Sequence, residues 1–229
     1  LRDAFDKDFG RQQEMLELFT RLFGPYPFAH YTALVTDDDL EIPIEAQGLS
    51  TFGANFCDGH RTEERLVAHE LAHQWFGNSL TLSRWCDIWL HEGFACYAEW
   101  LWSENSGGPS AQALAADAYR GLSRKPQDIL LEDPGAKDMF DDRIYKRGAL
   151  TLHALRLTLG DDSFFTLLRT WTSEHRHSNV TTTQFKDLAA RFSDTSLRPL
   201  WDAWLGQKEL PAPPRIWSAG NLIGGDGPV

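Results

Sequence analysis

The sequence of 229 residues is long enough for one large domain, and its 42% hydrophobic content provides for a substantial core. Its 22 basic and 33 acidic residues give a net charge of −11. This balance argues against nucleic acid as a partner, because phosphate binding needs a basic surface. No run approaches the roughly 20 apolar residues of a membrane-spanning helix.

The early part of the chain predicts a helix and a small amount of β-structure. Apolar residues at helical spacing indicate a helix from Phe9 to Phe23, ended by a Gly-Pro pair. Residues 31–36 then predict a buried strand. A second extended segment, Ile42 to Phe52, is interrupted by Pro43 and Gly48, which favours an edge strand.

From Thr62 onward the sequence predicts mostly helices. The first of these begins at Thr62 and is expected to end at the Gly77-Asn78 pair, with a short β-segment over 79–82 after it. Further helices are expected over 87–107, 111–121, 144–160, 163–175, 183–192 and 197–205.

A few strands followed by many helices indicate an α+β domain. We expect one domain over 1–210, with its β-containing part at about 1–60 and its helical part at about 61–210. The segment 211–229 is rich in Pro and Gly and is expected to be a disordered tail.

The helix predicted after Thr62 contains the pattern His-Glu-x-x-His. Residues i and i+4 share one helix face, so His69 and His73 can direct ring nitrogens at one metal ion. Glu70 lies beside that metal, where it can take a proton from water. Two outward-facing histidines on an ordinary helix are the alternative interpretation.

A third metal ligand strengthens this pattern, since a catalytic zinc needs three protein ligands and one open position. Glu92 follows His73 after eighteen intervening residues. That interval lets the chain leave the first helix, turn, and return a carboxylate from a second helix. The sequence therefore predicts one Zn²⁺ held by His69, His73 and Glu92.

These motifs resemble a known enzyme family. The His-Glu-x-x-His pattern, the eighteen-residue interval and the context Trp-Leu-x-Glu-Gly-Phe-Ala are similar to those of the gluzincin aminopeptidases, the family of aminopeptidase N and the leukotriene hydrolase-aminopeptidase. The resemblance spans roughly Phe9 to Leu205 and implies a thermolysin-like zinc peptidase fold. The family usually has Asn where this chain has His91, which we expect to tune the surroundings of the site.

The resemblance also implies two further functional residues. The transition-state tyrosine of the family precedes a Lys/Arg-Gly pair, which makes Tyr145 its counterpart and a donor to the oxyanion. The family's exopeptidase motif, commonly Gly-Ala-Met-Glu-Asn, corresponds to the segment around Glu45, although its Gly and Asn are absent here. Glu45 is then the anchor of the substrate's free amino group.

The expected activity is therefore hydrolysis of the N-terminal peptide bond of peptides with a free amino terminus. A thermolysin-like endopeptidase, an epoxide hydrolase and a non-catalytic peptide-binding scaffold are the alternatives. The family enzymes have a β-rich domain before this region, and we expect that domain to be missing from this chain, which begins at Leu1.

Several other residues are open to more than one interpretation. Asp87 is predicted either to orient a ligand imidazole or to cap a helix, and Glu99 to orient a ligand imidazole. Five tryptophans near the metal-binding helices are predicted to pack in the core, with a place in the wall of the substrate pocket as the alternative for one or two of them: Trp75, Trp85, Trp89, Trp100 and Trp102. Three cysteines without CxxC spacing indicate buried, reduced thiols and a cytoplasmic protein.

Overall fold

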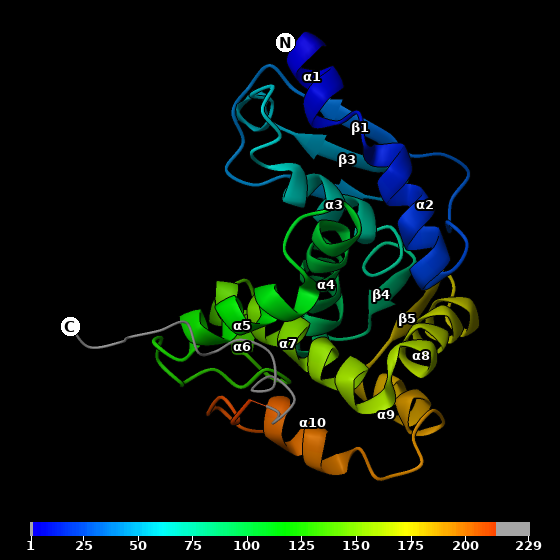
Figure 1. The fold of residues 1–229 in the computed structure, drawn as a ribbon, viewed down its shortest axis with the longest axis vertical. Coiled ribbons are helices and arrows are strands. Elements are labelled where there is room, and N and C mark those ends of the chain that lie inside the picture. Colours follow the sequence, from blue (N-terminus) through cyan, green and yellow to red (C-terminus); the bar gives the residue numbers. More distant parts are fainter. Residues whose placement is uncertain (1, 214–229) are drawn as a thin grey trace, which may run out of the picture.

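A small sheet forms one end of the molecule in this computed structural model, which describes residues 2–213 (Figure 1). Helices α1 (Arg2–Asp8) and α2 (Gln12–Phe23) lie beside it. The sheet has the order β1-β3-β2 and consists of β1 (Thr32–Val35), β2 (Ile44–Ala46) and β3 (Leu49–Phe52). Strand β1 runs parallel to β3, and β2 runs antiparallel to it.

The register of this sheet explains why the second extended segment forms two strands. Gly48 adopts a φ of +72°, which favours glycine, and turns the chain so that Glu45 pairs with Ser50. Strand β2 is the edge strand that was predicted, whereas β3 lies in the centre. The prediction of a buried strand at 31–36 was wrong, because β1 is the other edge and Leu34 is 47% exposed.

The rest of the chain forms a helical lobe. In chain order its elements are η1 (Ala54–Phe56), α3 (Glu64–Ala72), β4 (Leu80–Leu82), η2 (Trp85–Asp87), α4 (Trp89–Asn105), α5 (Ala111–Leu122), α6 (Gly135–Asp138), α7 (Asp142–Leu159), α8 (Asp161–Glu174), β5 (Ser178–Val180), α9 (Thr182–Ala190) and α10 (Arg198–Trp204). The α+β class predicted from the sequence is confirmed.

Helix α4 is the centre of this lobe. Every residue from Trp89 to Trp102 is buried, as expected of a helix that is covered on all sides. Helix α7 packs along it, and α3 packs against another part of its surface. Helix α3, which carries His69, and helix α7, which carries Tyr145, are thus both in direct contact with α4, which carries Glu92.

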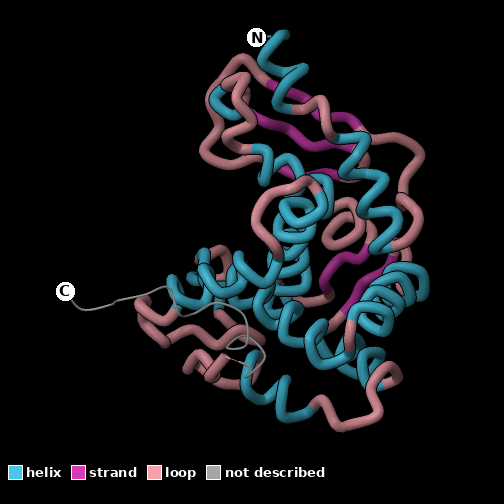
Figure 2. The backbone as a smooth tube through the Cα atoms, viewed as in Figure 1, coloured by secondary structure: helices cyan, strands magenta, loops and turns pink. Residues whose placement is uncertain are grey.

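A second, two-stranded sheet lies within the helical lobe, apart from the first (Figure 2). The β-segment predicted at 79–82 is confirmed as β4, which pairs in parallel with β5, so that Leu80 lies opposite Ser178. This pairing holds the segment between α3 and α4 against the C-terminal half of the chain.

Helix α3 is shorter than predicted. It ends at Ala72, and the prediction that it continues to Gly77-Asn78 was wrong. The chain turns earlier because Gly77, at a φ of +137°, donates its N–H to the carbonyl of Leu80 and starts the approach to β4.

Other outcomes concern individual segments. The tail predicted over 211–229 lies outside the described residues from 214 onward. Of the three cysteines only Cys96 is buried, so the prediction of three buried thiols was wrong for Cys57 and Cys86. Across 2–213, no helix has the length and apolar character needed to cross a membrane.

Candidate zinc site

Helix α3 and the residue after its end position two imidazoles. His73 keeps helical dihedral angles, with φ −57° and ψ −21°, so the i, i+4 relationship to His69 is preserved. The two ring centroids are 4.7 Å apart. Both side chains are buried, with residue exposures of 5% and 2%.

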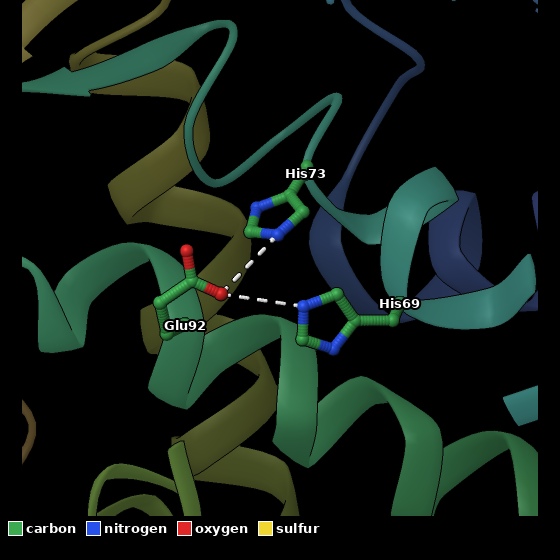
Figure 3. Close-up of side chains that lie close together, drawn as sticks. All are labelled: His69, His73 and Glu92. Carbon is green, nitrogen blue, oxygen red and sulfur yellow. Dashed lines mark hydrogen bonds and ion pairs between the residues drawn. The ribbon is translucent and has the colours of Figure 1, made fainter. Parts of the chain in front are cut away.

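Glu92 approaches these rings from the first turn of α4 (Figure 3). Its Oε2 lies 3.3 Å from Nε2 of His69 and 3.5 Å from Nε2 of His73. Ligand atoms at about 2.0–2.1 Å from a tetrahedral zinc ion lie about 3.3–3.4 Å from one another. The two distances from Glu92 therefore match the spacing of a tetrahedral zinc site, and all three ligand atoms lie within 4.8 Å of one another.

The other nitrogen of each ring is held by a hydrogen bond. Nδ1 of His69 donates to Oε1 of Glu99 at 2.8 Å, and Nδ1 of His73 donates to the carbonyl of Phe76 at 2.9 Å. These bonds place the proton on Nδ1 and leave both Nε2 lone pairs for a metal. Glu99 thus orients a ligand imidazole, as one interpretation of the sequence expected.

The electrostatics of the cluster favour positive charge at its centre. Burial alone would lower the pKa of each imidazole, but Glu92, together with Glu99 at His69, raises it to about 10 for His69 and about 9 for His73. Burial would raise the pKa of Glu92, yet the two imidazoles hold it far below its usual range. A divalent cation bound between Glu92 and the two imidazoles would supply the positive charge that this cluster favours.

Glu70 lies beside this cluster with an unusual environment for a carboxylate. It is 4% exposed, and its Oε2 accepts no hydrogen bond from the described residues. Burial raises the pKa of Glu70 to about 7. A carboxylate with a pKa near neutrality is suited to both taking up and releasing a proton.

Glu45 reaches the same place from strand β2. One carboxylate oxygen of Glu45, one of Glu70 and a ring nitrogen of His73 all lie within 4.8 Å of one another. The short strand that carries Glu45 packs against α3, which explains how a residue 24 positions before His69 enters the site.

Tyr145 enters from the first turn of α7. Its ring stacks on that of His69, with 6.0 Å between centroids and 23° between planes. Burial raises the pKa of Tyr145 above its ordinary value, so its hydroxyl keeps its proton at neutral pH. The phenol is therefore a hydrogen-bond donor next to a predicted zinc ligand.

These groups line a cavity of about 640 Å³. It is bounded by segment 41–45 and by residues from α3, α4 and α7. A side cavity of about 330 Å³ shares Glu45, Glu92 and Phe140 with it and extends toward β4 and Trp85. Together the two cavities are large enough to hold a peptide of more than one residue.

Comparison with known proteins places this chain among metallopeptidases. The model of the peptidase family M1 domain matches residues 8–204. The chain belongs to peptidase family M1. It is 30% identical over 219 residues to aminopeptidase N of Lactococcus lactis, a match that covers 86% of this chain and 25% of that protein. It is 30% identical over 202 residues to human endoplasmic reticulum aminopeptidase 1, covering 79% and 21%.

Solved structures of family M1 agree with this assignment. An M1 zinc metallopeptidase from Deinococcus radiodurans superimposes with a TM-score of 0.80 at 37% identity, over 90% of this chain and 46% of that one. The predicted resemblance to the aminopeptidase N family is confirmed, and the relatives and solved structures that match this chain are named aminopeptidases and zinc metallopeptidases. The chain spans about a quarter of the length of the curated relatives and under half of the solved one.

His91 and Asp87, for which the sequence suggested roles near the metal, form hydrogen bonds with backbone N–H groups in this M1 domain. Nε2 of His91 accepts a hydrogen bond from the Leu82 N–H at 3.0 Å, so the imidazole fastens β4 to the start of α4. Burial lowers the pKa of His91 to about 4, which keeps that nitrogen free to accept. Asp87 accepts from the Thr182 N–H at 3.2 Å and does not contact a predicted zinc ligand.

Some cavity residues were not assigned a role from the sequence. Phe140, 60% exposed, and Lys146 both line the zinc cavity, although Lys146 lies inside the motif that identified Tyr145. No spacing rule points to either residue, because each reaches the cavity through tertiary packing. Trp85 is 62% exposed and lines the side cavity, which agrees with the predicted alternative of a pocket wall, whereas the other four tryptophans are buried in the core.

Proposed function

We propose that this chain is the catalytic part of a zinc-dependent aminopeptidase that hydrolyses the first peptide bond of substrates with a free amino group. The observation that carries the proposal is the convergence of Glu45 with Glu70 and His73 beside the zinc cluster. A carboxylate at this position binds a substrate ammonium group and admits only the first peptide bond to the metal. The small sheet followed by a helical lobe supports the thermolysin-like class.

The residues divide the chemistry between them. His69, His73 and Glu92 would hold zinc, which when bound polarises a carbonyl and lowers the pKa of water to about 7. Glu70 takes a proton from the attacking water and passes it to the leaving amine. Tyr145 donates a hydrogen bond to the carbonyl oxygen as negative charge develops there.

Relatives support the choice of substrate. A variant of the Deinococcus radiodurans M1 zinc metallopeptidase has been solved with a Tyr-Ser-Ala substrate. We propose that this chain likewise takes short peptides with a free amino terminus. The exposed apolar side chains of Leu34, Ile42 and Ile44 on and beside the first sheet support the proposal that an upstream β-rich domain covers this region.

The test compares fluorogenic aminoacyl amides with their N-acetylated counterparts on the zinc-loaded protein, with and without a chelator. We expect cleavage of the free-amine substrates alone, and loss of that cleavage on chelation. Cleavage of blocked substrates at a similar rate would identify an endopeptidase instead.

A Glu45→Gln variant tests the amine anchor. Loss of a charge-assisted contact of about 1.5–3 kcal/mol lowers kcat/KM for free-amine substrates about ten- to hundredfold. Asp39→Asn removes the same charge from an exposed position nearby and should leave kcat/KM unchanged.

A further inference from the structure

Lys146 lines the zinc cavity and has no carboxylate partner of its own among residues 2–213. It follows Tyr145 on α7 and is half-buried. Its Nζ contacts Sγ of Cys96 at 3.5 Å, and no carboxylate of residues 2–213 lies within ion-pairing distance. A desolvated ammonium group that lacks a counter-ion is unfavourable unless something else supplies one.

The two acids whose charge acts on Lys146 are engaged elsewhere. Glu99 accepts from His69 and also pairs with Arg65 at 3.4 Å. Asp142 pairs with Lys125 at 2.8 Å. Each of these two acids therefore has a basic partner other than Lys146.

The ammonium group of Lys146 carries its charge at neutral pH. Burial alone would lower its pKa, but the surrounding acidic groups Cys96, Glu99 and Asp142 raise the pKa above its ordinary value. Burial raises the pKa of the Cys96 thiol, so its proton stays on sulfur and it does not neutralise the lysine.

Lys146 and the amine anchor Glu45 are positioned beside the zinc cluster by different elements, α7 and β2. Glu45 is next to His73 and Glu70, whereas Lys146 is next to Cys96, one helical turn after Glu92 along α4. One turn advances about 5–6 Å, and an extended peptide advances about 3.3–3.6 Å per residue. A peptide anchored at Glu45 with its first carbonyl at the metal thus brings its second residue within reach of this flexible side chain.

We propose that Lys146 binds a carboxylate carried by the residue that follows the scissile bond. The preferred substrates are then dipeptides with a free carboxyl terminus or peptides with an acidic second residue. This inference rests on the proposed aminopeptidase function, since Glu45 fixes the direction of the peptide. Arg65, which also lines the cavity, adds positive charge on the same side.

Calorimetric binding to the zinc-loaded Glu70→Gln protein tests the proposal without cleavage of the peptide. Leu-Asp-amide is compared with Leu-Asn-amide, and Leu-Ala with Leu-Ala-amide, which separates a side-chain carboxylate from a terminal one. We expect the acidic member of at least one pair to bind roughly tenfold more tightly, as for one charge-assisted contact. Equal affinities within both pairs would overturn the proposal.

Variants then assign the preference to this lysine. Lys146→Met in the same background should abolish the preference, whereas Lys7→Met, an equal charge change on the exposed face of α1, should retain it. Zinc content and thermal unfolding verify the fold of each variant, and Lys146→Gln serves if the Met variant does not fold. A preference that survives loss of the lysine contradicts its assignment.

Failure of this inference is distinguishable from failure of the proposed function. Turnover of Leu-Asn-amide by the wild-type protein measures aminopeptidase activity without any carboxylate in the substrate. Cleavage of this amide, with no Lys146-dependent preference, would retain the proposed function and remove only the role of Lys146.

Discussion

Gly93 on α4 and Gly148 on α7 touch backbone to backbone. A Cβ atom added to Gly148 would lie 2.6 Å from Cα of Gly93, closer than side-chain carbons pack. Gly93 follows the predicted zinc ligand Glu92, and Gly148 lies one turn after Tyr145. The contact between these two glycines therefore sets the distance between the metal cluster and the phenol.

A Gly148→Ala substitution should separate the two helices. Overpacking in a close contact costs about 1–3 kcal/mol, and we expect a loss of this size in the free energy of unfolding, with a lower kcat from the displaced Tyr145. Urea denaturation and steady-state kinetics measure both. Gly121→Ala on α5, where no atom lies within 4 Å of the added carbon, should be neutral or stabilise by about 0.4–1 kcal/mol. An unchanged Gly148→Ala protein would show that the helices tolerate separation.

Removal of the charge on Glu99 should weaken zinc binding. Glu99 accepts the Nδ1 proton of His69 at 2.8 Å and fixes the ring with its Nε2 toward the metal. Loss of such a partner lowers metal affinity about 10–100-fold. Competition with a chelator measures the zinc dissociation constant of Glu99→Gln, with Glu17→Gln on the exposed face of α2 as the matched control. Equal zinc affinities in the two variants would remove the orienting role of Glu99.

Glu70→Gln should separate chemistry from metal binding. The zinc-like spacing joins Glu92 to His69 and His73 and does not involve Glu70, whose buried carboxylate has a pKa of about 7. A positioned general base contributes about 10²–10⁴-fold to the rate, so kcat should fall by that factor while zinc content stays at one ion per chain. Retained turnover would exclude Glu70 as the base, and lost zinc would indicate a ligand instead.

The metal cluster was predictable because its spacing is set by local geometry. His69 and His73 share a helix face whatever surrounds the helix, and Glu92 lies inside a strongly helical, Trp-rich segment. The longer helices of the lobe were predictable for the same reason, whereas the four-residue helix α6 was not predicted. These longer helices show apolar residues at helical spacing. A polar capping residue marks the start of some of them, and the capping box of Thr181 and Gln184 at the start of α9 is an example.

Features that depend on distant partners were not predictable. Strand β5 has only three residues and exists because Ser178 pairs with Leu80, which lies almost a hundred positions earlier. The exposure of β1 follows from its edge position, which the apolar sequence of that strand does not reveal. The place of Lys146 in the cavity likewise depends on the packing of α7 on α4.

A buried histidine outside the zinc site should make the stability of the fold sensitive to acid. His153 on α7 contacts the hydroxyl of Tyr97 through Nδ1 at 3.1 Å and Oε1 of Gln112 through Nε2 at 3.0 Å. Burial lowers the pKa of His153 to about 4, whereas the same side chain in the unfolded chain titrates near its ordinary value of about 6.5. Between these values the unfolded state binds more protons than the folded state.

Stability contributed by neutral His153 is therefore present above about pH 6.5 and is lost as the pH falls toward about 4, by about 1.4 kcal/mol for each unit. Urea denaturation at about pH 7 and pH 5 measures this loss. Acid also protonates the zinc ligands, so the informative quantity is the difference between variants. His153→Gln should show a smaller loss on acidification than the wild type, whereas His30→Gln, at an exposed position, should match the wild type. Equal losses in all three proteins would mean that His153 titrates normally in the folded state.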